Sequence, residues 1–172
     1  MNTVFRSYAT GIIVLFAAAI IETAILSNIA LLPVVPDILL ISHIAIAVKN
    51  GKVQGQTLGF VSGLFLDMLT GVPLGFNCLI RTIIGYSAGS IGTAINTTGI
   101  FIPAVCGVLA TLLKALLTWL VSLCFPALIN TLSVFSVDFL WEAGCALVLS
   151  PLLFKFLALF DGFILMPQRR VR

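Results

Sequence analysis

Hydrophobic residues fill the sequence in long runs that are separated by short clusters of Pro, Gly, Asn and charged residues. Such clusters mark turns and loops, and a helix needs about 20 mainly apolar residues to cross a bilayer. The pattern predicts six transmembrane helices in a compact bundle, at residues 8–32, 36–48, 53–70, 74–95, 99–125 and 138–160. The second run is short, which fits a tilted helix or one that starts among the headgroups.

The composition supports this all-α membrane fold. Of 172 residues, 60% are hydrophobic and only 9% are charged, whereas soluble domains carry roughly a quarter charged residues. The chain has too little polar surface for a soluble globule and no segment for a separate soluble domain, so we predict a single domain over residues 1–172. The net charge of +3 comes from scattered basic residues, which do not form a nucleic-acid binding patch.

The basic residues predict the orientation, because cytoplasmic loops are enriched in Lys and Arg. With the N-terminus inside, the cytoplasmic side would hold Arg6, Lys49, Lys52 and a short basic tail at 161–172, and the three outer loops would hold no Lys or Arg. We therefore predict a multi-pass membrane protein with both termini in the cytoplasm.

Motifs for catalysis or metal binding are missing from the sequence. It has no phosphate-binding loop, no HExxH zinc motif and no nucleophile elbow. The four cysteines lie far apart in apolar runs without metal-ligand or redox spacing. The single histidine, His43, is more typical of a hydrogen-bonded packing residue than of a ligand or proton relay. The sequence predicts no enzyme, cofactor or metal site.

Glycines recur at steps of four in two neighbouring runs. Gly55, Gly59 and Gly63 lead to Asp67 in the third run, and Arg81 leads to Gly85 and Gly89 in the fourth. Positions four apart share a helix face, and small residues at this spacing let helices approach closely in lipid. Because the connecting turn is short, the two helices are predicted to pack as antiparallel neighbours.

Ionisable residues inside membrane helices usually face a partner or a cavity. Asp67 lies roughly 5 Å and Arg81 about 9 Å below the outer ends of their helices, and a flexible Arg side chain can span this difference. We therefore predict an ion pair between them, with Glu142 as a competitor for Arg81. Glu22 and Lys114 both lie near mid-membrane and form a second candidate pair. The favoured interpretation is structural pairing, and a substrate or ion pathway and a partner-facing surface are the alternatives.

Residues 59–89, GFVSGLFLDMLTGVPLGFNCLIRTIIGYSAG, resemble the central signature of the MreD family of rod shape-determining membrane proteins. The matching elements are Gly59-Phe60, Gly63, Asp67, Gly71, Leu74-Gly75 and Gly85-Tyr86, and Pro36-Asp37-Ile38-Leu39-Leu40 resembles the start of the family's second span. The resemblance covers about a third of the chain. Arg81 belongs to no pattern of that family, so its pairing is inferred from this sequence alone.

This resemblance implies a non-enzymatic subunit of the cell-elongation machinery in the bacterial inner membrane. Family members associate with the bitopic protein MreC, and through it with MreB, RodA and a class B penicillin-binding transpeptidase that build peptidoglycan. The candidate structural and partner-binding residues are then Pro36, Asp37, Gly59, Gly63, Asp67, Gly71, Pro73, Gly75, Arg81 and Gly85. Membrane lipids are expected to surround the bundle, and a homo-oligomer is left open.

Two other functions are compatible with the sequence. The MreD family is similar in fold to the S components of energy-coupling-factor vitamin transporters, so a small-molecule binding subunit is the main alternative. Its pocket would be lined by Asp37, Asn77, Arg81 and Glu142. A proton-coupled carrier that uses Glu22 and Lys114 is the weaker alternative.

Overall fold

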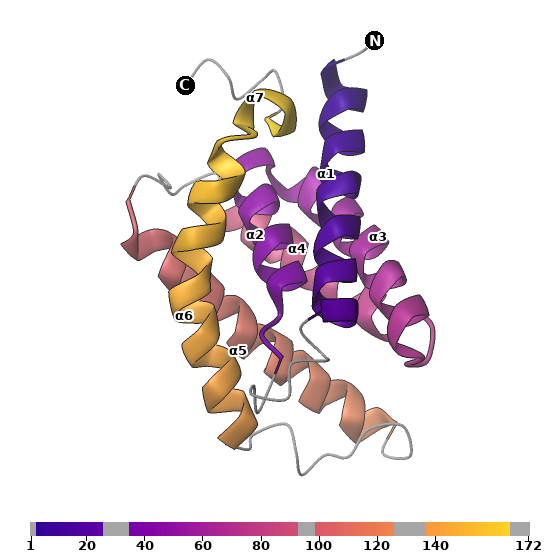
Figure 1. Cartoon of the computed structure of the whole chain (residues 1–172). Coiled ribbons are helices and arrows are strands. Elements are labelled where there is room, and N and C mark those ends of the chain that lie inside the picture. The colour runs from indigo at the N-terminus through magenta and orange to yellow at the C-terminus, as the bar shows by residue number, and fades with distance from the viewer. Residues whose placement is uncertain (1–2, 26–34, 93–98, 126–136, 166–172) are drawn as a thin grey trace.

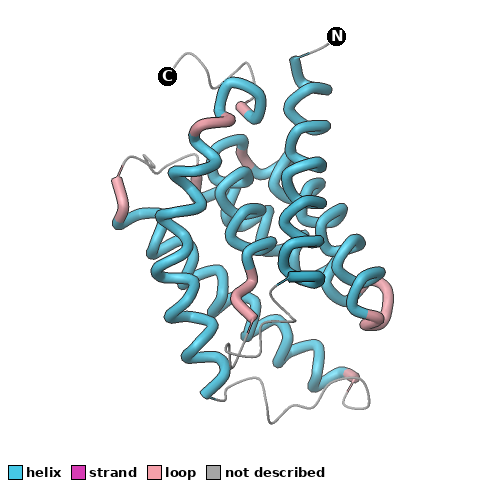
Figure 2. The backbone as a smooth tube through the Cα atoms, viewed as in Figure 1, coloured by secondary structure: helices cyan, strands magenta, loops and turns pink. Residues whose placement is uncertain are grey.

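A computed structural model describes residues 3–25, 35–92, 99–125 and 137–165 of the chain. In this part every regular element is a helix (Figures 1 and 2). The elements are α1 (Thr3–Ile20), the π-helical turn η1 (Ile21–Ile25), α2 (Ile38–Asn50), α3 (Lys52–Thr70), α4 (Phe76–Ile91), α5 (Phe101–Cys124), α6 (Val137–Ala158) and α7 (Asp161–Ile164).

Each of the six predicted hydrophobic runs overlaps one helix of 13 residues or more, so the all-α fold is confirmed. Three helical segments of the described part are long and apolar enough to cross a membrane, namely Val4–Ala24, Phe101–Cys124 and Phe139–Ala158. The six-span count stays a prediction. The short helix α7 lies where the sequence predicted only a tail. The predicted loops at 33–36, 96–99 and 126–138 lie largely outside the described residues, and so does most of the basic tail.

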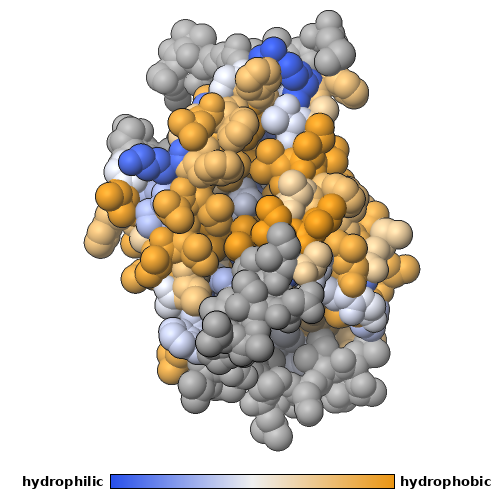
Figure 3. All heavy atoms as spheres, viewed as in Figure 1, coloured by the Kyte–Doolittle hydropathy of each residue, from blue (hydrophilic) through white to orange (hydrophobic). Residues whose placement is uncertain are grey.

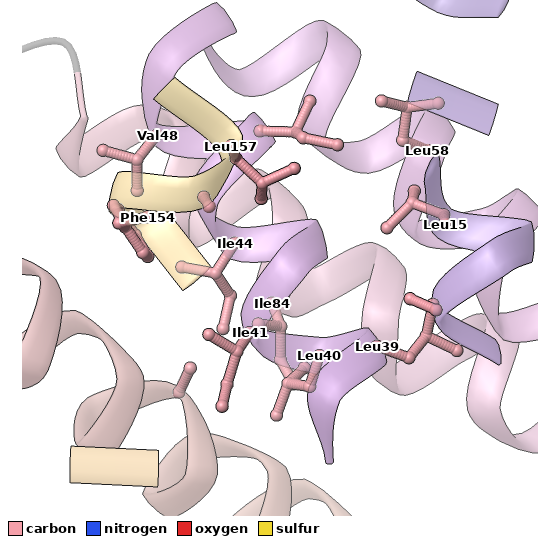
Figure 4. Close-up of a cluster of buried hydrophobic side chains, with 14 of the residues drawn as sticks. Leu15, Leu39, Leu40, Ile41, Ile44, Val48, Leu58, Ile84, Phe154 and Leu157 are labelled. Atoms are coloured by element: carbon pink, nitrogen blue, oxygen red, sulfur yellow. The ribbon is translucent and has the colours of Figure 1, made fainter. Parts of the chain in front are cut away.

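Helix α2 forms the centre of the bundle. Every residue in it is buried except Ile38 and Lys49, and its leucines and isoleucines meet side chains from α1, α3, α4 and α6 (Figure 4). At 13 residues it is about 20 Å long, which is shorter than the roughly 30 Å hydrocarbon layer. Because α2 is short and covered on all sides, its N-terminus lies inside the bundle. The free backbone N–H groups at that end therefore need hydrogen-bond partners.

Glycines with positive φ angles form the tight connections around the α2–α3–α4 unit. Gly51 (φ 95°) joins α2 directly to α3, Gly71 (φ 67°) ends α3, and Gly75 (φ 102°) precedes α4. L-residues with a side chain rarely adopt such angles. The predicted turn between the third and fourth helices is therefore present, with Pro73 inside it.

Both ends of the described chain meet at one end of the bundle, where α7 packs beside the start of α1 (Figure 1). Lys49 binds Asp161 at 2.6 Å, and Asn50 Nδ2 donates to the carbonyl of the buried Ile164 at 3.0 Å. The Ser7 hydroxyl donates to the same carbonyl. The surface in Figure 3 is mostly hydrophobic over its middle, and its most hydrophilic residues lie toward this end. These contacts anchor α7 to α1 and α2.

Candidate functional site

Helices α3 and α4 touch along their backbones. A Cβ atom built on Gly55 would lie 2.3 Å from the carbonyl oxygen of Gly85, and one on Gly59 would lie 2.4 Å from that of Arg81. At Gly63 the distance to the backbone nitrogen of Cys78 would be 2.5 Å. The structure thus contains the close approach that the glycine spacing predicts. We call these contacts the glycine seam.

His43 of α2 completes the glycine seam. Its ring is fully buried, and Nε2 lies 2.8 Å from the carbonyl oxygen of Gly55. Because a carbonyl only accepts hydrogen bonds, Nε2 carries the proton. A Cβ on Gly59 or Gly85 would lie 2.9 Å or 2.6 Å from the imidazole. The histidine is a hydrogen-bonded packing residue, as its sequence context suggested, and it joins three helices at one point.

Asp67 caps the N-terminus of α4. Its carboxylate accepts hydrogen bonds from the backbone N–H of Gly75 at 2.9 Å, and from the backbone and side-chain N–H groups of Asn77 at 3.0 and 2.8 Å. The backbone N–H of Cys78 lies within 3.4 Å. The first amides of a helix have no partner inside that helix, and a carboxylate is favourable at this positive end of the helix dipole.

The predicted Asp67–Arg81 ion pair is therefore wrong. The turn folds α4 back so that the free amides at its N-terminus lie within reach of Asp67. The guanidinium of Arg81 lies about one and a half helical turns further along α4. Arg81 presents its backbone carbonyl to Gly59 on α3, while its side chain binds Asp37 on α2. Asp67 still builds the α3–α4 hairpin, but through backbone amides.

Asp67→Ala should destabilise the protein by about 1–3 kcal/mol, because the part-buried amide donors at the start of α4 lose their acceptor. Thermal unfolding of the purified protein in detergent measures this effect. Thr70→Ala is the matched control at the same end of α3, since its hydroxyl only donates to the Leu66 carbonyl of its own helix. An equal loss of stability in the two variants would contradict the capping role.

Asp37 is the hub of an internal ionic cluster. Its side chain is 8% exposed and accepts two contacts from Arg81 Nη2, at 2.8 and 3.0 Å. Lys114 Nζ of α5 lies 2.8 Å from Asp37 Oδ2 and 2.6 Å from Glu142 Oε1 of α6. The four side chains come from four parts of the bundle and carry two positive and two negative charges, so the cluster is neutral as a set.

The N-terminus of α2 receives two carboxylates. Asp37 Oδ1 accepts from the backbone N–H of Leu40 at 2.7 Å, which makes it the N-cap residue. Glu22 Oε2 accepts from the backbone N–H of Leu39 at 2.9 Å. Glu22 lies in the π-helical turn η1 that extends α1. Helix α1 therefore contacts the N-terminus of α2, and α4, α5 and α6 are linked to the same end of α2 through the ionic cluster.

Two further sequence predictions on charges are wrong. Lys114 binds Asp37 and Glu142 instead of Glu22, and Glu142 binds Lys114 instead of competing for Arg81. The sequence places Glu22 and Lys114 at similar depth and Glu142 near the outer end of its helix, but depth does not give the direction in which a side chain points. A signal for Asp37 was present, because Pro-Asp before an apolar run is typical of a helix N-cap.

The remaining candidates form the frame around these contacts. Pro36 is buried and its carbonyl accepts from the N–H of Ile38 at 2.9 Å. Gly71, Pro73 and Gly75 form the turn that carries the α4 amides to Asp67. In the described residues no three His, Cys, Asp or Glu side chains are placed to hold a metal ion.

An apolar groove of about 320 Å³ lies between α5 on one side and α2 and α4 on the other. Its floor includes Ile44 of α2, Ile84 of α4 and Ala110 of α5, which are buried. Its rims include Ile91 and Val105, which are 49% and 41% exposed. This groove contains no charged side chain, in contrast to the ionic cluster beside it.

The sequence matches the family described as rod shape-determining protein MreD over residues 5–160, which is nearly its whole length. The chain belongs to the MreD family. Membership extends the resemblance from the central glycine-rich segment to the helices on either side of it. No curated protein and no solved structure matches the chain. This MreD-family chain is a rod shape-determining membrane protein, and its likeness to S components stays a prediction.

Proposed function

We propose that the chain is a non-enzymatic, six-span subunit of the bacterial cell-elongation complex, with both termini in the cytoplasm. In that role it binds the bitopic protein MreC and helps to organise peptidoglycan synthesis. Membership of the MreD family carries this proposal. Through MreC the subunit would act indirectly with MreB, RodA and a class B penicillin-binding transpeptidase.

The contacts inside the bundle support a scaffold role. Asp37, Arg81, Lys114 and Glu142 bind one another, and Asp67 binds backbone amides. Such internal pairs fix which helix faces which neighbour. Exposed apolar side chains of the described helices are left for lipids and for the helices of partners. In lipid, helix association depends on close packing and polar contacts between helices.

The arrangement gives less support to a vitamin-binding subunit. Four side chains were candidates for its pocket, and each is engaged within the protein: Asn77 with Asp67, and Asp37, Arg81 and Glu142 in the ionic cluster. The proton-carrier alternative needed Glu22 beside Lys114, and the two have different partners. No contact among the described residues favours either alternative.

Depletion in the native host tests the proposal. Cells that lose the protein should change from rods to spheres, and a copy carrying Gly144→Ala should restore rods because nothing lies within 4 Å of the added methyl. Affinity purification of this variant from membranes should recover MreC. Rod-shaped cells after complete depletion, or purification without MreC under conditions that preserve other membrane complexes, would contradict the proposal.

A further inference from the structure

The ionic cluster divides into two neutral halves. Arg81 Nη2 donates to both carboxylate oxygens of Asp37 within the α1–α4 part of the bundle, which we call the body. Lys114 and Glu142 form an ion pair between α5 and α6. We call these two helices together the α5–α6 pair. The contact between Lys114 and Asp37 at 2.8 Å links the two parts. We call this contact the bridge.

Breaking the bridge would leave each part with a complete ion pair. Removing one partner of a buried ion pair is costly because an unpaired charge remains in a medium of low dielectric. Here Asp37 would keep Arg81, and Lys114 would keep Glu142. Glu22 binds the Leu39 amide within the body and would stay there in either arrangement. The bridge can therefore open at a much lower cost than either of the two pairs.

The helices pack more closely within the body and within the α5–α6 pair than across the interface between α5 and the body. Inside the body, the glycine seam holds α3 and α4 in backbone contact. Inside the α5–α6 pair, a Cβ on Gly107 would overlap the Ser150 side chain, so these helices also meet closely. Between α5 and the body lies the apolar groove of about 320 Å³. Interfaces in close contact resist movement, whereas a groove offers room for it.

The α5–α6 pair also contacts the body away from the bridge, where α6 packs on α2. Phe154 and Leu157 of α6 are buried against α2, near Val48 and Ile44 (Figure 4). At the same end, Asp161 of α7 binds Lys49 of α2. Rotation about these contacts would carry α5 away from α4 or toward it, and would change the width of the groove.

We propose that the α5–α6 pair moves as a unit relative to the body, and that the Asp37–Lys114 bridge is the releasable contact that holds the groove in its narrow state. This inference concerns the conformational states of the chain alone. It stands whether or not MreC is the partner, and a failure of the depletion experiment would leave it unaffected.

Spin labels across the groove test the inference in lipid nanodiscs. The labels replace Ile91 and Val105 on its rims, in a chain whose four native cysteines are alanines. The double variant Lys114→Met/Glu142→Gln removes the bridge and leaves both parts neutral. It should shift the measured distance distribution to longer values. The single variant Glu142→Gln keeps the bridge and is the matched control, so it should retain the shorter distance.

A second label pair shows whether the parts move as units. Labels at Leu109 and Leu152, both on the α5–α6 pair and both exposed, should report the same distance in the bridge-free and control variants. Identical distances across the groove in both variants would overturn the inference, and so would a change within the α5–α6 pair that equals the change across the groove.

The same label pairs in the chain with its native charges provide a reading that does not need the double variant. If the bridge opens, the Ile91–Val105 distances should have a wider distribution than the Leu109–Leu152 distances, because only the first pair spans the groove. Equal widths for the two pairs would overturn the inference even where the double variant does not fold.

Discussion

Replacing Gly85 by leucine should leave almost no folded protein in the membrane, and Gly85→Ala should already lower the unfolding midpoint strongly. A Cβ at this position would lie 2.2 Å from the carbonyl oxygen of Gly55 and 2.6 Å from Nε2 of His43. Overpacking a core against side chains costs about 1–3 kcal/mol. Here the opposing atoms belong to the backbone and to a buried ring, so the helices themselves must separate.

Size-exclusion chromatography of detergent extracts and thermal unfolding measure this effect. Gly144→Ala in α6 is the matched control, because nothing lies within 4 Å of its added methyl. Alanine is favoured over glycine in helices by up to about 1 kcal/mol, so the control should be as stable as the native protein or slightly more stable. A Gly85→Ala protein with a native midpoint would show that α3 and α4 are not in backbone contact.

The glycine seam could be predicted from the sequence because it depends on local regularity. Gly55, Gly59 and Gly63 repeat at steps of four, and the period of the helix places such residues on one face. The short turn at Gly71–Gly75 then fixes the neighbour. Each step uses residues close in sequence, so spacing alone predicts which helices touch.

The ionic partners could not be predicted in the same way. Asp37, Arg81 and Lys114 come from three helices whose order around the bundle is set by packing, which the sequence pattern does not encode. Counting residues gives a depth for Arg81 and for Lys114, but a similar depth does not identify the partner. The decisive fact was that α2 is short and central, so that its N-cap residue lies within reach of both cations. Shortness was visible in the sequence, but the central position was not.

The prediction for Asp67 failed for a more specific reason. Comparing depths on two neighbouring helices pairs Asp67 with Arg81, but it does not count the backbone as a partner. In lipid every exposed amide also needs an acceptor. Gly75 precedes α4 and Phe76 begins it, and neither has a side chain that could cap the helix. Asp67 supplies the missing cap from the preceding helix.

Asp37→Asn should destabilise the protein more than Arg81→Met does, although the two residues form one ion pair. The asparagine can still accept a hydrogen bond from the Leu40 amide, so the substitution chiefly removes the charge. Arg81, which is 2% exposed, then loses the carboxylate that binds it. Among the described residues its Nη1 atom already lacks a hydrogen-bond partner. Leaving a buried charge unpaired costs about 3–5 kcal/mol.

Arg81→Met should destabilise the protein less, because Asp37 is also bound by Lys114. In Arg81→Met the carboxylate keeps Lys114 at 2.8 Å and the Leu40 amide at 2.7 Å. The double variant Asp37→Asn/Arg81→Met removes both charges, so it should be more stable than Asp37→Asn alone. Unfolding of the three variants in mixed micelles, analysed as a double-mutant cycle, measures the coupling between the two residues.

Lys49→Met serves as the control for the loss of an ion pair outside the cluster. Its pair with Asp161 lies at the end of the bundle, with side chains 10% and 32% exposed, and partly exposed pairs contribute at most about 1 kcal/mol. The order of stability should be Lys49→Met, then Arg81→Met, then Asp37→Asn as the least stable. If Asp37→Asn were as stable as Lys49→Met, the ionic cluster would not fix the helices around α2. The Asp37–Arg81 pair would then not hold the body, to which the bridge attaches the α5–α6 pair, in one arrangement.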